Sequence, residues 1–286
     1  MLSYKSLLRL MLCVGLCAGM GFAQEGGGLK APAETYDWAT PMKEVAKKFS
    51  GTQGVYLLVG DSITYANPNT QYCRYGQGQS PAEKAFLKWA HAGEKNDSDG
   101  FHLAAADAAG GRSHTAVSGI RADESLKGGK AGIPALDALI KKYNPQLVLY
   151  MLGTNDLSGN RPVAQYIADV EKAMDLFLAN GTVPILSTLP PHKHRLEACE
   201  AYNTALRQLA EKKKIPLLDL NAEMKARAGD GYMDAYLDKD GIHLSVNGIA
   251  AGPATEENLK KSGYLLRGYT TVQKGMIVKA QVLDAK

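Results

Sequence analysis

The sequence predicts an α/β fold, a three-layer, doubly wound parallel sheet, and two observations carry that prediction. Short, nearly continuous apolar runs recur along the 286 residues, and segments with helical spacing of apolar residues separate them. Strands that are apolar at nearly every position are typical of parallel sheets whose two faces are both covered. The five expected strands are 55–60, 101–106, 147–152, 183–189 and 215–220.

Amphipathic segments between these runs predict the covering helices, at 81–91, 133–142, 163–178 and 196–213. An earlier helix is expected to start at Thr40-Pro41, with Thr as N-cap and Pro at the first helical position, and to end near Phe49. A further helix is expected to start around Ser245. In such folds ligands bind at the carboxyl ends of the strands, so motifs at those ends are candidates for function.

The N-terminus reads as a secretory signal peptide. Lys5 and Arg9 precede the apolar run 10–22, and small residues at Gly21 and Ala23 fit cleavage after Ala23. The run is short for a membrane span, which needs about 20 apolar residues. Cleavage would lower the formal charge from +4 to +2, too little to indicate binding to nucleic acid or to an anionic membrane surface. The expected location is secreted or periplasmic.

The rest of the chain divides into three parts. Residues 24–50 are expected to form a Gly- and Ala-rich linker followed by the first helix, and residues 51–262 the α/β domain. The extension 263–286 could form a hairpin that turns near Lys274-Gly275. Cleavage would leave two cysteines, Cys73 and Cys199. They could form a disulfide, as exported proteins often do, or remain two separate buried thiols.

Two polar motifs follow predicted strands in the same way. Gly60-Asp61-Ser62 comes at the end of the first strand, and Gly153-Thr154-Asn155-Asp156 comes directly after the run 147–152. Either motif alone is compatible with an ordinary turn, because Gly, Ser, Asn and Asp all favour turns. Their shared position at the carboxyl ends of separate strands favours a hydroxyl and an amide brought together at one site.

Two further segments complete a set suited to nucleophilic chemistry. Asp240 precedes His243 by three residues, so its carboxylate could orient the imidazole, and a serine nucleophile needs a base of this kind. The segment 108–113 contains Gly110 and Gly111, either of which could offer an unobstructed backbone N–H to an oxyanion. A surface histidine and a glycine turn are the alternatives.

Taken in order, these four blocks resemble those of the SGNH (GDSL-like) hydrolases, over roughly 55–243. The resemblance implies a flavodoxin-like sheet and hydrolysis of esters or thioesters, including acyl groups on sugars, without metal or organic cofactor. By position, Ser62 resembles the nucleophile, His243 the general base and Asp240 its orienting acid. The Ser62 and Gly111 backbone N–H groups and the Asn155 side chain resemble the oxyanion hole.

The sequence departs from the family pattern in the second block. An Asn usually stands a few residues before the glycine, whereas Ala106 and Asp107 stand here, so the choice between Gly110 and Gly111 stays open. His192-Lys193-His194 lacks nearby Cys or acidic ligands and is interpreted as a polar loop rather than a metal site. The polar stretch 64–79, with three tyrosines, is interpreted as a loop suited to a sugar-like ester.

The sequence therefore predicts an exported serine esterase that removes an acyl group, with a carbohydrate ester as the expected substrate. A lipase or thioesterase acting on acyl chains is the alternative within enzymes. A catalytically inactive protein that binds carbohydrate or a partner protein is the alternative from another class. The expected ligand is a small-molecule or carbohydrate ester, with no nucleic acid, no cofactor and no membrane span after processing. The acyl and alcohol groups and the oligomeric state stay undetermined.

Overall fold

A computed structural model describes residues 27–92 and 114–285 of the chain. Its sheet has four parallel strands in the order β1-β2-β3-β4. The strands are β1 (Tyr56–Gly60), β2 (Leu147–Met151), β3 (Val183–Ser187) and β4 (Leu217–Leu218). Four of the five predicted strands are thus confirmed, with β4 shorter than expected. The fifth, 101–106, lies outside the described residues.

The chain changes direction across the sheet at β1. Gly60 pairs with Met151 of β2 on one side, and it forms a parallel bridge with Ala116 on the other. The Gly60 N–H donates to the Thr115 carbonyl (3.2 Å), and the Val117 N–H donates to the Gly60 carbonyl (3.3 Å). Residues 115–117, which precede β2 in the sequence, therefore lie on the edge of β1 opposite β2. This arrangement makes β1 a topological switch point, where doubly wound sheets bind ligands.

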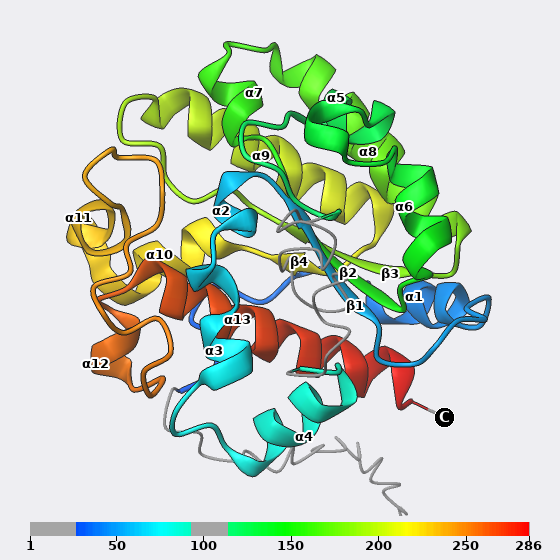
Figure 1. Cartoon of the computed structure of the whole chain (residues 1–286), viewed down its shortest axis with the longest axis horizontal. Helices are drawn as coiled ribbons and strands as arrows, with labels where there is room; N and C mark the ends of the chain where they lie inside the picture. The colour runs from blue at the N-terminus through cyan, green and yellow to red at the C-terminus, as the bar shows by residue number, and fades with distance from the viewer. Residues whose placement is uncertain (1–26, 93–113, 286) are drawn as a thin grey trace, which may run out of the picture.

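Helices cover both faces of this sheet (Figure 1). In the view of Figure 1, α5 to α9 lie above the strands, and α3, α4 and α13 lie below them. The four predicted helices are confirmed within a few residues as α4, α6, α8 and α9. The helical elements are α1 (Ala39–Ala46), α2 (Ser62–Tyr65), α3 (Pro68–Tyr75), α4 (Pro81–Trp89), α5 (Ala122–Lys127), η2 (Lys130–Gly132), α6 (Leu136–Tyr143), α7 (Thr154–Ser158), α8 (Val163–Ala179), α9 (Leu196–Lys213), α10 (Leu220–Ala228), η3 (Gly229–Gly231), α11 (Tyr232–Tyr236), α12 (Glu256–Leu259), α13 (Gly263–Val278) and η4 (Lys279–Leu283).

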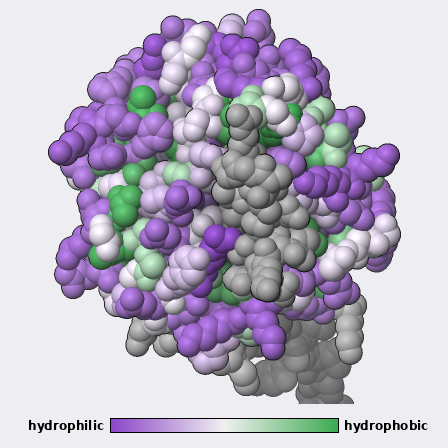
Figure 2. All heavy atoms as spheres, in the orientation of Figure 1, coloured by the Kyte–Doolittle hydropathy of each residue, from purple (hydrophilic) through white to green (hydrophobic). Residues whose placement is uncertain are grey.

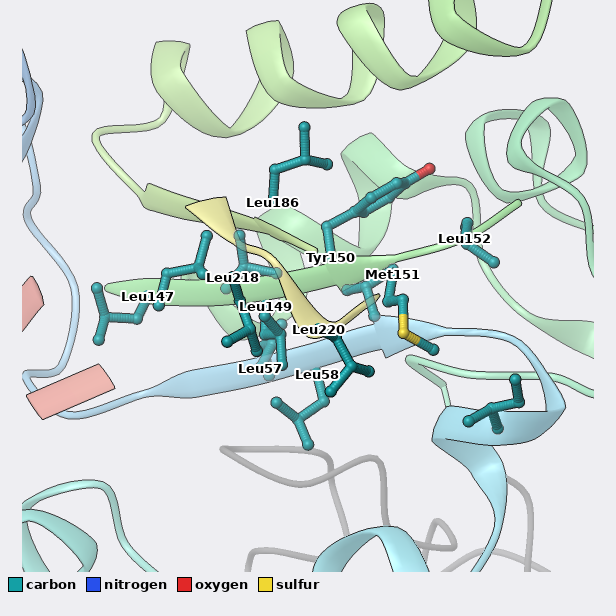
Figure 3. Close-up of a cluster of buried hydrophobic side chains, with 14 of the residues drawn as sticks. Leu57, Leu58, Leu147, Leu149, Tyr150, Met151, Leu152, Leu186, Leu218 and Leu220 are labelled. Atoms are coloured by element: carbon teal, nitrogen blue, oxygen red, sulfur yellow. The ribbon is translucent and has the colours of Figure 1, made fainter. Parts of the chain in front are cut away.

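The core lies between the sheet and its helices. Every residue of β1, β2 and β3 is buried, as continuous apolar strands require when both faces are covered. Leu57, Leu149, Leu186 and Leu218, from the four strands, belong to one buried cluster (Figure 3). On the molecular face seen in Figure 2, hydrophilic side chains predominate among the described residues. The strand ends are therefore held by a close-packed interior.

The C-terminal extension does not form the hairpin that the sequence suggested. Residues 263–278 form helix α13, whose N-cap Ser262 accepts a hydrogen bond from the Leu265 N–H. The expected turn at Lys274-Gly275 lies inside this helix. A Cβ at Gly275 would lie 2.5 Å from Phe86 Cζ, so the glycine permits close helix packing rather than a turn. Nearly all of α13 is buried, which makes it a core element.

The described part of the predicted linker is also ordered against the domain. The Glu223 carboxylate accepts hydrogen bonds from the Lys30 N–H (2.7 Å) and the Ala31 N–H (2.6 Å). Glu223 also pairs with the buried Arg227 at 2.7 Å. Glu34 pairs with Lys274 of α13. The two backbone hydrogen bonds and the Glu34–Lys274 pair fix the segment in place, so the linker prediction is wrong for residues 27–34.

Three local predictions are also corrected. No helix starts at Ser245, because residues 245–255 are irregular up to the N-cap Thr255 of α12. The stretch 64–79 is largely helical, in α2 and α3, and its Tyr72 and Cys73 are buried. Cys73 and Cys199 are free, so the disulfide alternative is wrong and the two thiols are separate and buried.

No helix in the described ranges, 27–92 and 114–285, is long and apolar enough to cross a membrane.

Candidate active site

Ser62 is placed by the exit from β1. Gly60 ends the strand, and a Cβ there would lie 1.9 Å from Thr64 Oγ1, so only glycine allows the chain to turn this closely. The buried Asp61 is the N-cap of α2, and its Oδ1 accepts the Ile63 N–H at 3.0 Å. Ser62 is the first residue of that helix. The motif thus forms a tight turn that projects the serine at the carboxyl end of the first strand.

His243 and Asp240 approach this serine from a distant part of the chain. Ser62 Oγ lies 2.9 Å from His243 Nε2, and His243 Nδ1 lies 2.5 Å from Asp240 Oδ2. A carboxylate only accepts hydrogen bonds, so Nδ1 carries the proton and Nε2 is left to accept the serine hydroxyl. The structure therefore brings the three predicted residues into one hydrogen-bonded chain.

The Asp240 carboxylate is held by its own loop. Its Oδ1 accepts the Ile242 and His243 N–H groups, both at 2.9 Å. Partial burial alone would raise the pKa of Asp240, but the hydrogen bonds from the His243 ring and from these two backbone groups outweigh it and hold the pKa below its usual value. Asp240 therefore stays ionised through the range in which histidine titrates.

The loop containing His192, Lys193 and His194 supports the Asp240 loop. The Lys193 N–H donates to the Gly241 carbonyl (2.8 Å), and His194 Nε2 lies 3.0 Å from the Asp240 carbonyl oxygen. His192 is buried and lies 3.2 Å from Ser158 Oγ through its Nε2. Within the described residues no cluster of His, Cys, Asp or Glu could hold a metal ion. Residues 192–194 lie in the loop between β3 and α9, and this loop contacts the Asp240 loop.

Asn155 lies beside the turn formed by residues 60–62, here called the nucleophile turn after the predicted role of Ser62, and its motif predicted this position. Its Nδ2 donates to the Ile120 carbonyl at 3.0 Å and lies 3.5 Å from Asp61 Oδ2. The second contact is at the limit of a hydrogen bond, so the hydrogen pointing that way is available to a better acceptor. The side-chain amide therefore stands within reach of Asp61, the residue before Ser62.

The other residues of the second motif are structural. Asp156 is fully buried, and its carboxylate accepts the Ala122 N–H (3.0 Å) and a hydrogen bond from Arg161 (2.8 Å). Arg161 also pairs with Asp169 of α8. These bonds tie α7, which carries Asn155, to α5 and α8. Asp156 thus fixes the element that presents Asn155.

Two candidates cannot be placed. Gly110 and Gly111 lie outside the described residues, and the description resumes just before the segment 115–117 that pairs with β1.

The sequence argument missed two further residues, Arg267 and Thr64. Arg267 of α13 is buried and donates to Thr64 Oγ1 at 2.7 Å, directly below the nucleophile turn. A signal was present, because Arg267 falls within the apolar helical pattern of 264–272.

A serine at the end of the first strand, hydrogen-bonded to a histidine near the end of the fold, is the arrangement that the four sequence blocks suggested. Residues 58–251, about two thirds of the chain, match the family model of the GDSL-like lipase/acylhydrolase family. The chain belongs to this family. It is accordingly a hydrolase of carboxylic esters, with the SGNH type of α/β fold.

Solved structures are similar to this chain at low sequence identity, and the first of them shows the fold. A carbohydrate esterase of family 3 from Talaromyces cellulolyticus is 17% identical, with a TM-score of 0.50 over 81% of this chain and 99% of that one. A GDSL-like lipase from Bacteroides thetaiotaomicron is 15% identical, with a TM-score of 0.48 over 87% of this chain and 100% of that one. No protein with a curated description matched the chain. At these identities the likeness concerns the fold.

Proposed function

We propose that this family member is a serine esterase that uses Ser62, His243 and Asp240 as a catalytic triad. The observation that carries the proposal is the hydrogen-bonded chain from Ser62 Oγ through His243 to Asp240, at the carboxyl end of the switch-point strand. Each contact has the geometry that its role requires. The serine faces the free nitrogen of the ring, and the carboxylate holds the protonated one.

The first half-reaction follows from this geometry. As Ser62 Oγ attacks the ester carbonyl carbon, His243 Nε2 takes its proton and the ionised Asp240 stabilises the imidazolium. When the tetrahedral intermediate collapses, His243 returns the proton to the leaving alcohol. Water then attacks the acyl-enzyme by the same sequence and releases the acid. The whole cycle uses this chain's own groups.

The negative charge on the carbonyl oxygen needs fixed donors. We assign the Ser62 backbone N–H and the Asn155 side-chain amide to this role, together with the Gly111 N–H that the family resemblance implies. Asn155 Nδ2 makes a single short hydrogen bond, to Ile120, and its longer contact with Asp61 is the one an oxyanion would replace. Donors held in place before the reaction cost no reorganisation when charge develops.

The substrate we propose is a short acyl group on a carbohydrate. The His243 and Asp240 side chains are 41% and 46% exposed, so the described side of the site is open enough for a bulky alcohol. The two side chains that form the hydrogen-bonded chain with Ser62, His243 and Asp240, are polar. The structurally similar Talaromyces protein is named a carbohydrate esterase.

We further propose that the protein is exported, with cleavage after Ala23. The support is the sequence of residues 1–23, with its charged start, apolar run and small residues at the cleavage site. N-terminal sequencing of the protein recovered from outside the cytoplasm of an expressing cell tests this, and the expected first residue is Gln24. A chain that keeps residues 1–23 would contradict the proposal.

One experiment separates the candidate functions. A fluorophosphonate should add to Ser62, identified by peptide mass, and Ser62→Ala should not react. Turnover is then measured on p-nitrophenyl acetate, butyrate and octanoate and on acetylated xylan. We expect faster turnover of p-nitrophenyl acetate than of the octanoate. We also expect release of acetate from the acetylated xylan. A preference for octanoate would indicate a lipase or thioesterase, and an unlabelled wild type would indicate a protein without esterase activity.

A further inference from the structure

Arg267 is a buried cation beneath the nucleophile turn. It lies on α13, its side chain is 1% exposed, and its Nη2 donates to Thr64 Oγ1 at 2.7 Å. Among the described residues it forms no ion pair, and its Nη1 has no hydrogen-bond partner. Burying a charge in this way costs free energy that an apolar residue of similar size would save. The cost suggests a function for the charge at this place.

Thr64 transmits the contact to the nucleophile. It belongs to the four-residue helix α2, which Ser62 begins, and its N–H donates to the Asp61 carbonyl at 3.1 Å. Its Oγ1 fills the space that a Cβ on Gly60 would occupy. The Thr64 hydroxyl therefore lies between the end of β1 and the guanidinium and is close to both. A shift of Arg267 would move the turn that carries the serine.

Asp61 is the second group that the charge reaches. Its carboxylate is fully buried and caps α2. Burial raises the pKa of Asp61, while the Ile63 N–H and then the positive charge of Arg267 act against that rise. Burial lowers the pKa of Arg267 to about 10, so it remains charged at neutral pH. The interior below Ser62 therefore holds a cation and a buried carboxyl group, and the cation favours the ionised form of that carboxyl group without direct contact.

We propose that Arg267 is a positioning residue for the nucleophile. Through Thr64 it fixes helix α2, and its charge favours the ionised Asp61 that caps that helix. The contact with Thr64 and the electrostatic effect on Asp61 together keep the Ser62 hydroxyl facing His243 and the Ser62 N–H facing the developing oxyanion. The inference rests on the proposed function of Ser62. It makes α13, the last long helix of the chain, part of the active-site architecture.

The same helix offers a matched control. Lys274 is also a buried cation of α13, 2% exposed, but it pairs with Glu34 of the N-terminal segment and lies over Trp38. Lys274→Met therefore removes a buried positive charge from α13 without touching the nucleophile turn. Comparing it with Arg267→Met separates a general loss of stability from a specific loss of positioning.

The test measures the second-order rate constant of fluorophosphonate labelling, together with kcat and KM for p-nitrophenyl acetate. Labelling is measured well below the melting temperature of each variant, so that the rate constant is that of the folded molecules. We expect Arg267→Met to lower it and kcat by about 10- to 100-fold, the effect of a small misplacement of reacting groups, with KM little changed. Arg267→Lys should restore part of the rate. Lys274→Met should melt at a lower temperature and label at the wild-type rate.

A double-mutant cycle tests the route through Asp61. If the charge of Arg267 acts on the Asp61 carboxylate, Arg267→Met should lower the labelling rate constant by a smaller factor in an Asp61→Asn background than in the wild type. Equal costs in both backgrounds would reject this route. Wild-type labelling of Arg267→Met, or equal slowing by Lys274→Met, would overturn the inference. Should Arg267→Met not fold, Thr64→Val tests the other contact, and labelling at the wild-type rate would overturn the inference as well.

The pH profile adds a readout that a purely structural role would not move. Removing the Arg267 charge should raise the pKa of Asp61 further, so the acid limb of the labelling rate should move to higher pH. This shift should vanish in the Asp61→Asn background. Three other titratable groups face Asp61 and stay in place in all variants, namely His243 from its loop, Tyr264 of α13 and Tyr166 of α8. A wild type that does not label at Ser62 would instead reject the proposed function, and the inference with it.

Discussion

The two halves of the proposed triad are built in opposite ways. The nucleophile half, residues 60–65, is supported from within the protein, because Asp61, Ile63 and Thr64 are buried and Arg267 lies beneath them. The base half, residues 238–244, is supported at the surface. Its His243 and Asp240 side chains are 41% and 46% exposed, and local backbone hydrogen bonds and the 192–194 loop hold them.

This difference indicates that the buried half contributes the position of the reacting groups and the exposed half contributes the negative charge. Buried contacts fix the serine and Asn155 closely, at the cost of burying Asp61 and Arg267. The exposed loop keeps Asp240 ionised with little burial, and water screens its charge. Changes in the buried half should therefore affect stability and catalysis together. Changes in the exposed half should affect catalysis with little loss of stability.

The largest effect is expected for Ser62→Ala. The variant loses the group that forms the acyl-enzyme, so turnover should fall to less than about a thousandth of the wild-type value. Its melting temperature should change little, because the capping bond of Asp61 and the helix α2 remain. Turnover of p-nitrophenyl acetate and a thermal melt check both points. Retained turnover would reject Ser62 as nucleophile.

Asn155→Ala comes next and distinguishes a donor from a turn residue. Removing one oxyanion donor costs roughly 10²–10³ in kcat with KM little changed, because the interaction forms in the transition state. Steady-state kinetics and the labelling rate should fall together. A wild-type kcat with only a lower melting temperature would leave Asn155 as a structural residue that bonds the Ile120 carbonyl.

The sequence predicted the sheet and the cluster of Ser62, His243 and Asp240 because both follow from local patterns. Apolar runs marked β1, β2 and β3, and each polar motif followed its strand directly. What it missed depends on contacts between distant segments. Nothing near residue 267 shows that Thr64 lies opposite, 203 positions earlier. Residues 27–34 were also missed, because their ordering depends on hydrogen bonds to Glu223. Helix α13 was missed because burial against the rest of the fold stabilises the helix there.

Asp240→Asn tests the exposed half. The amide oxygen can still accept from the Ile242 and His243 N–H groups, so the loop should keep its shape and stability. The amide nitrogen then replaces the oxygen that faced His243 Nδ1 and donates to that atom, which places the ring proton on Nε2 and removes the charge that stabilises the imidazolium. Steady-state kinetics should show a kcat lowered by up to about 10⁴-fold, with an unchanged melting temperature.

The pH dependence of the same variant sharpens the assignment. If a histidine is the base, the wild-type rate should rise with pH across the range in which histidines titrate, while Asp240, with its lowered pKa, stays ionised throughout. Asp240→Asn removes this negative charge, so its residual rate should follow a different pH profile. A wild-type rate that is flat between about pH 5 and 8 would count against His243 as the base.

Two glycines offer the closest comparison of the halves, and the smallest expected effects. In Gly60→Ala the new Cβ would lie 1.9 Å from Thr64 Oγ1 and 2.9 Å from the Met151 carbonyl oxygen. Neither neighbour can move easily in the buried turn, so the cost should reach about 1–3 kcal/mol of overpacking. That corresponds to several degrees in melting temperature, with a fall in kcat as α2 is displaced.

Gly241→Ala should be the milder change. Gly241 has a φ of +70°, where a side chain costs about 1–2 kcal/mol, and its Cβ would lie 2.8 Å from Lys193 Cβ. The loop beneath it reaches solvent, so Lys193 can shift and relieve the contact, although its backbone bond to the Gly241 carbonyl would weaken. We therefore expect both the melting temperature and kcat to fall less than in Gly60→Ala. Thermal melts and kinetics of both variants, measured side by side, provide the check. If Gly241→Ala lost as much stability as Gly60→Ala, the base half would have to be as rigidly packed as the nucleophile half, and the contrast between them would be lost.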